Sequence, residues 1–194
     1  MSISLQKGQK IRLSKESGEA LDKVVLGLGW DVSAPKKGLL GFFGLSSEID
    51  LDASCLLFDK AGQLVDIVWF DQLSGLNGAV QHTGDNVTGA GEGDDEQIVV
   101  KLSQLPPTVT TLVFVVNSYN GQSFDRVQNA YCRLLEADSQ QEIARYSLDS
   151  HGEHTAMIMT KLYRHVGEWR MHAIGSFDHG KTPHDLLPVV KSYL

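Results

Sequence analysis

Short β-rich runs, each bounded by Gly, Pro, Asn or Asp, follow one another along most of the chain. Residues 51–59 and 64–70 are two such runs, and the connection Lys60-Ala-Gly-Gln63 between them is typical of a hairpin. Similar runs lie at residues 2–14, 23–30, 97–102, 111–116, 130–137, 143–148, 156–165 and 168–175. About ten short strands with turn signals between them predict an all-β fold, a β-sandwich of two mainly antiparallel sheets.

Helical signal is confined to two places in the chain. Ser123 is a candidate N-cap for a single turn at 123–127, and residues 182–194 are expected to form a short C-terminal helix with Pro183 near its start. The 194 residues show no internal repeat and no linker rich in Pro, Gly and Ser. We therefore expect one domain over residues 1–194.

Three features predict a soluble, cytoplasmic protein that does not insert into a membrane. The first residues contain no apolar core of the length that a secretory signal needs. The longest uncharged stretch, residues 102–124, is interrupted by Pro106-Pro107 and by polar side chains, so it predicts a buried strand and not a transmembrane helix. Cys55 and Cys132 both lie in apolar runs, as is typical of buried, reduced thiols in a cytosolic chain.

The charge of the chain is concentrated in one segment. The formal net charge is −7, yet residues 1–60 and residues 101–194 each contain equal numbers of basic and acidic residues. Residues 61–100 contain no Lys or Arg and seven acidic residues: Asp66, Asp71, Asp85, Glu92, Asp94, Asp95 and Glu96. This balance argues against a nucleic acid or an anionic membrane bound through bulk charge.

The segment from Asp85 to Glu96 combines five carboxylates, one carboxamide and three glycines. Like charges packed this closely repel one another, and a hard divalent cation would relieve the repulsion. Ca²⁺ takes roughly six to eight oxygen ligands, and the glycines would let backbone carbonyls face the ion beside the side chains. Asp50 and Asp52 project to one face of an extended strand, opposite the apolar residues of that run, and Asp31 lies at another strand exit.

Other interpretations of these residues are weaker. A solvated acidic loop is the common alternative, but the lack of any basic residue across residues 61–100 and the matching Asp-x-Asp pair favour a metal. The register is not that of an EF-hand, Gly89-Ala-Gly-Glu-Gly93 lacks the pattern of a phosphate-binding loop, and Mg²⁺ prefers fewer carboxylates. No histidine has a partner at a recognised metal-ligand spacing, and nothing resembles the Gly-x-Ser-x-Gly motif of hydrolases.

Four motifs follow one another along the chain: Gly27-Leu-Gly-Trp-Asp31, Asp50-Leu-Asp-Ala-Ser54, His82-Thr-Gly-Asp-Asn86 and Gly91-Glu-Gly-Asp-Asp-Glu96. In this order they resemble the TerD domain of bacterial tellurite-resistance and stress-response proteins. The later segments Gly121-Gln-Ser-Phe124, Asn129-Ala-Tyr-Cys-Arg133 and Glu142-Ile-Ala-Arg-Tyr146 are also similar to that family. The resemblance covers nearly the whole chain, and within the family the sequence is most similar to the TerZ branch.

The resemblance implies a β-sandwich that binds two Ca²⁺ ions and has no established enzymatic activity. It implies metal ligands at nine positions: Asp31, Asp50, Asp52, Asp85, Asn86, Glu92, Asp94, Asp95 and Glu96. Two neighbouring sites that share a carboxylate would use this set, although Ala90 stands where many TerD domains have a carboxylate. It also implies association with other tellurite-resistance proteins, near a membrane partner.

Two further classes of function remain open from the residues alone. One is an enzyme that uses a divalent metal on a phosphate ester or nucleotide, although the scarcity of Lys and Arg around the acidic segment counts against such substrates. The other is a small-molecule-binding module for a nucleotide-like ligand. The favoured hypothesis is a non-enzymatic protein whose interactions with partner proteins depend on calcium.

Overall fold

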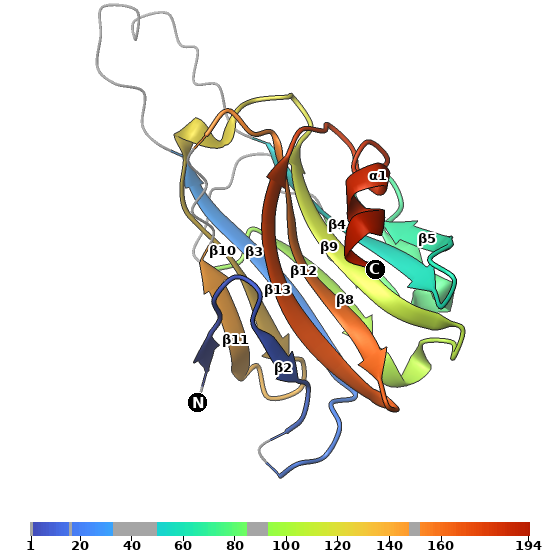
Figure 1. Cartoon of the computed structure of the whole chain (residues 1–194). Coiled ribbons are helices and arrows are strands. Elements are labelled where there is room, and N and C mark those ends of the chain that lie inside the picture. The colour runs from blue at the N-terminus through green and yellow to red at the C-terminus, as the bar shows by residue number, and fades with distance from the viewer. Residues whose placement is uncertain (1, 16, 33–49, 85–92, 148–151) are drawn as a thin grey trace, which may run out of the picture.

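A computed structural model places the chain in two β-sheets that pack face to face (Figure 1). The structure describes residues 2–15, 17–32, 50–84, 93–147 and 152–194. Thirteen strands lie within these residues, and every pairing between them is antiparallel except that of β1 with β11. The predicted all-β sandwich of two mainly antiparallel sheets is therefore confirmed.

The seven-stranded sheet lies at the back of the view in Figure 1. Its strands, in spatial order, are β1 (Ile3–Ser4), β11 (Glu142–Ser147), β10 (Val127–Glu136), β3 (Lys23–Val32), β8 (Glu96–Lys101), β7 (Val80–His82) and β6 (Ser74–Gly75). The central strands β10 and β3 are long, whereas β7 and β6 at one edge are only two or three residues each.

The six-stranded sheet lies in front and carries the short C-terminal helix on its outer face (Figure 1). Its strands, in spatial order, are β2 (Lys10–Arg12), β13 (Glu168–Asp178), β12 (Ala156–His165), β9 (Val109–Ser118), β4 (Leu51–Asp59) and β5 (Leu64–Val68). The β4–β5 hairpin was predicted, and Gly62 adopts the left-handed backbone conformation (φ 73°) that its turn requires.

Alternation along β4 decides which side chains fill the core. Leu51, Ala53, Cys55 and Leu57 pack between the two sheets, as the sequence predicted. Leu56 and Phe58 point the other way and join a second apolar cluster beneath α1 (Leu187–Val190). Both faces of β4 are therefore buried over most of its length.

The helical segments are shorter than the sequence suggested. Residues 182–186 form turns, α1 begins only at Leu187, and a 3₁₀ turn (Lys191–Tyr193) follows it. The cause is Pro188, which lacks an amide hydrogen and is therefore accommodated in the first turn of a helix. The predicted turn at Ser123 is confirmed, since the Ser123 hydroxyl accepts a hydrogen bond from the Asp125 amide at the start of a 3₁₀ turn (Phe124–Arg126).

Among the residues that the structure describes, no helix has the length and apolar character that crossing a membrane requires.

Cys55 and Cys132 are buried in the core and are not joined in a disulfide, as predicted.

Candidate metal centre

Three strands bring predicted ligand residues to one end of the sandwich. Asp31 lies near the end of β3, Asp50 and Asp52 lie at the start of β4, and Asp95 and Glu96 lie at the start of β8. Strand β3 ends and β4 begins at the upper end of the molecule in Figure 1. β8 joins them there because Glu96 is paired with Leu28 of β3.

The Asp95 carboxylate is held against β3. Its Oδ2 accepts a hydrogen bond from the Trp30 amide at 2.9 Å, and the Asp95 amide donates to the Leu28 carbonyl at 2.8 Å. Partial burial raises the pKa of Asp95 above its usual range, against the opposing effect of the Trp30 hydrogen bond, and the negative charges of Asp31 and Asp94 raise it further. Asp31 and Asp95 therefore form a pair of mutually repelling carboxylates.

Glu96 links the two sheets at this end. Its side chain is fully buried, and its Oε2 accepts a hydrogen bond from the Ala53 amide of β4 at 2.6 Å. The same oxygen lies 3.4 Å from Nε2 of His82, another fully buried side chain at the end of β7. Nδ1 of His82 accepts a hydrogen bond from the Gly84 amide at 3.1 Å, so the neutral ring carries its proton on Nε2, toward Glu96.

Asp50 and Asp52 lie on the face of β4 that is opposite the core residues Leu51 and Ala53, as the alternation predicted. Asp52 is buried, and its Oδ2 is 3.4 Å from Nδ2 of Asn117 on the neighbouring strand β9. The Oδ1 atom of Asp50 is also buried. Glu96 contacts the same strand at the next residue, because it accepts the hydrogen bond from the Ala53 amide.

Asp94 has a different set of partners. Its Oδ1 accepts hydrogen bonds from Nε of Arg133 at 2.7 Å and from the Tyr131 hydroxyl at 3.2 Å, and its Oδ2 accepts one from Gln97 at 3.0 Å. The carboxylate rests on Gly27 of β3, where a β-carbon would overlap it. The structure therefore places Asp94 in an ion pair on the outer face of the seven-stranded sheet, where its charge still acts on Asp95.

Three of the nine predicted ligands, Asp85, Asn86 and Glu92, lie outside the described residues. Within the residues that are described, no three His, Cys, Asp or Glu side chains are grouped around one point that could hold a metal ion. Five predicted ligand residues, Asp31, Asp50, Asp52, Asp95 and Glu96, thus lie at the same end of the sandwich without surrounding a single point.

Sequence reasoning missed the polar residues that orient these carboxylates. Besides His82, they include Asn117 beside Asp52 and Asn129, whose Nδ2 donates to Asp31 at 2.8 Å. Asn129 has a positive φ of 51°, which asparagine tolerates better than most residues, and it interrupts the pairing of β10 with β3. An asparagine at a break in strand pairing is the sequence signal that could have indicated this residue. Only the fold shows that it contacts Asp31.

The donor chemistry of this end suits a hard divalent cation. Asp31, Asp50, Asp52, Asp95 and Glu96 offer oxygen atoms, and the mutual repulsion of Asp31 and Asp95 is the electrostatic arrangement that such an ion relieves. The guanidinium of Arg133 is engaged by Asp94.

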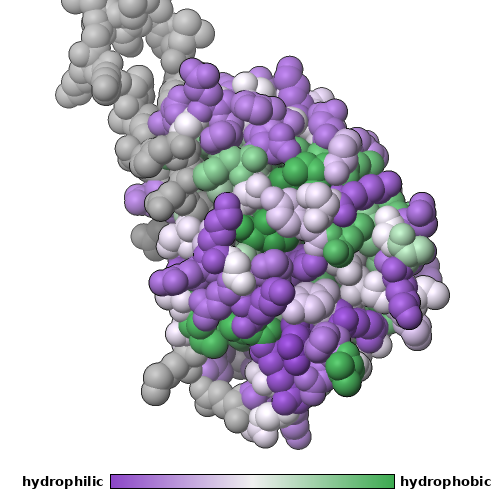
Figure 2. Space-filling view, in the orientation of Figure 1, coloured by the Kyte–Doolittle hydropathy of each residue, from purple (hydrophilic) through white to green (hydrophobic). Residues whose placement is uncertain are grey.

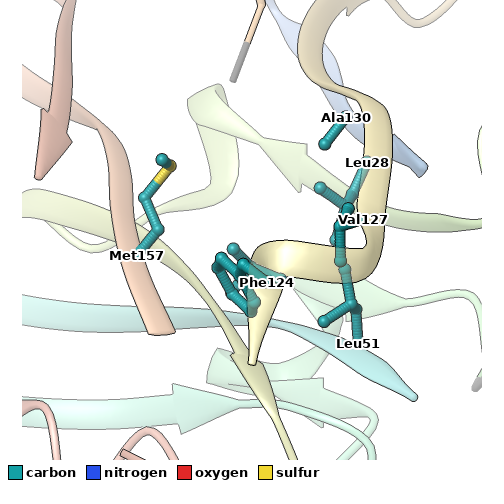
Figure 3. A pocket seen from close by; sticks show the side chains of 7 residues that line it. Leu28, Leu51, Phe124, Val127, Ala130 and Met157 are labelled. Carbon is teal, nitrogen blue, oxygen red and sulfur yellow. The ribbon is translucent and has the colours of Figure 1, made fainter. Parts of the chain in front are cut away.

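Figure 3 shows a small apolar space beneath this end, between the sheets. Its lining residues are Leu28, Leu51, Val116, Phe124, Val127, Ala130 and Met157. At about 10 Å³ it has room for about one water molecule, and its lining offers no polar side chain. A nucleotide does not fit in it, which counts against an interior ligand site at this position.

Comparison with known proteins finds a match to the TerD domain over residues 1–186. The tellurium resistance protein TerZ of Serratia marcescens is 48% identical over 185 residues, which cover 95% of this chain and 94% of that protein. General stress protein 16U of Bacillus subtilis (strain 168) is 42% identical over 184 residues, covering 91% of each chain. A crystal structure of a homologue of telluride resistance protein TerD from Streptomyces coelicolor A3(2) shares the fold, with a TM-score of 0.69 and 20% identity over 87% of this chain and 96% of that one.

Proposed function

This chain belongs to the TerD-domain family, and from that premise we propose that it is a calcium-binding, non-enzymatic protein of a bacterial tellurite-resistance and stress-response system. In this proposal the protein works in the cytoplasm and contacts other tellurite-resistance proteins when calcium is bound. The names of its relatives support the cellular role, since they include tellurium resistance and general stress proteins.

The observation that carries the calcium proposal is the convergence of carboxylates from β3, β4 and β8 at one end of the sandwich. Asp95 and Asp31 repel each other there, and partial burial adds to the cost of the Asp95 charge. Such an arrangement destabilises the ionised protein by itself and favours a bound cation. The aspartates and Glu96 offer oxygen atoms as metal ligands, and oxygen is the ligand that Ca²⁺ prefers.

The residues that would hold the metal are Asp31, Asp50, Asp52, Asp95 and Glu96, with Asp85, Asn86 and Glu92 from the adjoining segment. Asp94 has a supporting role in this proposal, because its ion pair with Arg133 fixes the start of β8. Calcium would supply positive charge, and two ions would reduce the formal net charge from −7 to about −3.

An enzymatic function finds less support than a binding function. Metal-dependent chemistry on a phosphate substrate requires a base or a cation near the metal to manage the charge of the substrate. The guanidinium of Arg133 is held by Asp94 at 2.7 Å, and residues 61–100 contain no Lys or Arg. The proposal is therefore that calcium completes the folding of this end and thereby forms a surface for partner proteins.

The test is calorimetric titration of Ca²⁺ into chelator-stripped protein, together with thermal unfolding in Ca²⁺ and in EGTA. We expect a saturable heat and a raised melting temperature, since a ligand at a hundredfold excess over its Kd stabilises a fold by about 2.7 kcal/mol, or roughly 5–10 °C here. Asp50→Ala and Asp85→Ala should each abolish most of the shift. Asp138→Asn, at an exposed position, is the control and should keep it.

The absence of both a heat and a shift in the wild-type protein would overturn the calcium proposal. Equal effects of Mg²⁺ and Ca²⁺ would overturn the choice of metal. Pull-down of partners from a tellurite-resistant bacterium, carried out once in calcium and once in chelator, tests the interaction. Partner binding that is unchanged in chelator would contradict a calcium-dependent role.

A further inference from the structure

The outer face of the six-stranded sheet carries a second group of charges, far from the acidic segment in sequence. Five side chains, here called the basic face, lie on three adjacent strands: Lys10 and Arg12 on β2, Arg170 and His172 on β13, and Lys161 on β12. The residues between them, Ile11, Met171 and Leu162, pack into the core, so the five project outward. Figure 2 shows hydrophilic side chains gathered over the lower central part of this surface.

The strand register places these like charges directly opposite one another. Arg12 is paired with Arg170, and His172 is flanked by Lys10 on β2 and by Lys161 on β12. Like charges in directly opposed positions of an antiparallel sheet destabilise it. A chain with a net charge of −7 has no general excess of basic residues that would lead to such a cluster, so the arrangement requires an explanation.

Neighbouring acids neutralise only part of this charge. Arg12 forms an ion pair with Glu168 at 2.7 Å, in which both side chains are partly exposed. Burial lowers the pKa of Lys161 and that of His172, and in each case the positive charge of Lys10 lowers it further. The Lys161 ammonium donates to the Tyr193 carbonyl, a neutral acceptor that leaves its charge in place.

Two buried polar atoms on the basic face also lack hydrogen-bond partners. Among the residues that the structure describes, neither Nε of Arg170 nor Nδ1 of His172 has a hydrogen-bond partner, although both atoms are buried. A buried polar atom without a partner costs free energy, typically about 1–3 kcal/mol. An acceptor that carries negative charge would satisfy Nε of Arg170, and Nδ1 of His172 in the ring form that has its proton there, and would relieve the repulsion at the same time.

We propose that the basic face binds a small phosphate-bearing anion, either inorganic phosphate or a phosphate monoester. Arginine and lysine side chains bind phosphate oxygens through short, charge-assisted hydrogen bonds. The basic face spans about 10 Å across its three strands, and its side chains two residues apart on one strand are separated by about 7 Å. An area of this size matches one phosphate group and not an extended polyanion. The net charge of −7 opposes long polyanions as well. This proposal is independent of the calcium site.

The experiment is a titration of the full, ¹⁵N-labelled chain with sodium phosphate in EGTA, with ionic strength held constant by sodium chloride. The His172 ring signals are followed by NMR, and affinity is measured by calorimetry. We expect a saturable shift at His172. Lys10→Gln should weaken binding about tenfold, the factor that corresponds to the loss of one charged hydrogen bond. Lys60→Gln removes the same charge from the exposed β4–β5 turn and should leave the affinity unchanged.

Thermal unfolding separates binding from a structural effect. Because Lys10→Gln removes a repelling charge from an exposed position, it should melt no lower than the wild type while it binds phosphate less tightly. A response that does not saturate, or an equal loss of affinity in Lys10→Gln and Lys60→Gln, would overturn the proposal. Co-sedimentation with phosphatidylglycerol vesicles without any response to phosphate would also overturn it, and would indicate a membrane surface as the ligand.

Discussion

The two thiols illustrate how burial controls chemistry at the scale of single residues. Cys132 lies in the core, where removal from water raises the pKa of its thiol to about 12. Burial likewise raises the pKa of Cys55 well above its usual value, and the nearby charge of Asp66 raises it further. The thiolate is the reactive form of cysteine, so neither residue is suited to react with oxidants or oxyanions in the folded protein.

We therefore expect the native protein to resist alkylation. Iodoacetamide at mildly alkaline pH should leave both cysteines unlabelled, whereas denaturant should expose both to rapid modification, and mass spectrometry counts the labels. A single label on the folded chain would contradict the structural role assigned to these residues.

At the candidate site, the sequence predicted side-chain positions that depend only on the local geometry of a strand. The shared face of Asp50 and Asp52 followed from strand alternation alone. The ion pair of Asp94 did not, since it depends on Gly27 and Arg133 in strands that are distant in sequence. The contact between His82 and Glu96 could not be predicted either, because it joins two different strands.

Glycines shape the outer face of strand β3 at the scale of the element. A β-carbon at Gly27 would overlap the Asp94 carboxylate, and one at Gly29 would lie 2.5 Å from the Tyr131 ring. The two glycines thus leave room on the outer face of the sheet for Asp94 and Tyr131, which share a hydrogen bond, and Asp94 also binds Arg133. The Gly-Leu-Gly spacing of the sequence serves this packing.

Gly27→Ala should destabilise the fold by about 1–3 kcal/mol, because overpacking would displace Asp94 from its ion pair with Arg133. Urea unfolding measures the change. In an Asp94→Ala background the same substitution should cost less, since the space would already be open. Equal costs in both backgrounds would show that the packing at Gly27 does not depend on Asp94.

The strands themselves were largely predictable, and the exceptions have physical causes. The run at residues 2–14 was expected to be one strand, but it divides into β1 and β2, which belong to different sheets. Gly8, with a φ of 85°, lies between them and allows the chain to change direction. Strands β6 and β7 were not predicted, because two or three residues are too few to show alternation.

The stability of the whole molecule should depend on pH through Glu142. A hydrogen bond from Arg145 lowers the pKa of this carboxyl below its usual 4.5; burial opposes the effect, while Ser2 and the charge of Arg133 add to it. A depressed pKa means that Glu142 stabilises the folded state above its ordinary pKa and loses this contribution as the pH falls through the folded value.

Glu142→Gln should therefore lower the free energy of unfolding at neutral pH by less than about 1 kcal/mol, since the group is partly exposed. Urea unfolding at neutral pH and at a pH well below 4.5 provides the measurement. The difference from the wild type should vanish in acid. Glu19→Gln, at an exposed position, serves as the control, and a difference that persists in acid would contradict this assignment.

The pairing of β1 with β11 and of β2 with β13 has a consequence for the order in which the protein forms. These two strands are synthesised well before their partners, which lie more than a hundred residues later in the chain. Contacts between such distant positions require the closure of long loops, which slows their formation. Through most of translation β1 and β2 therefore lack the strands that they pair with in the folded protein.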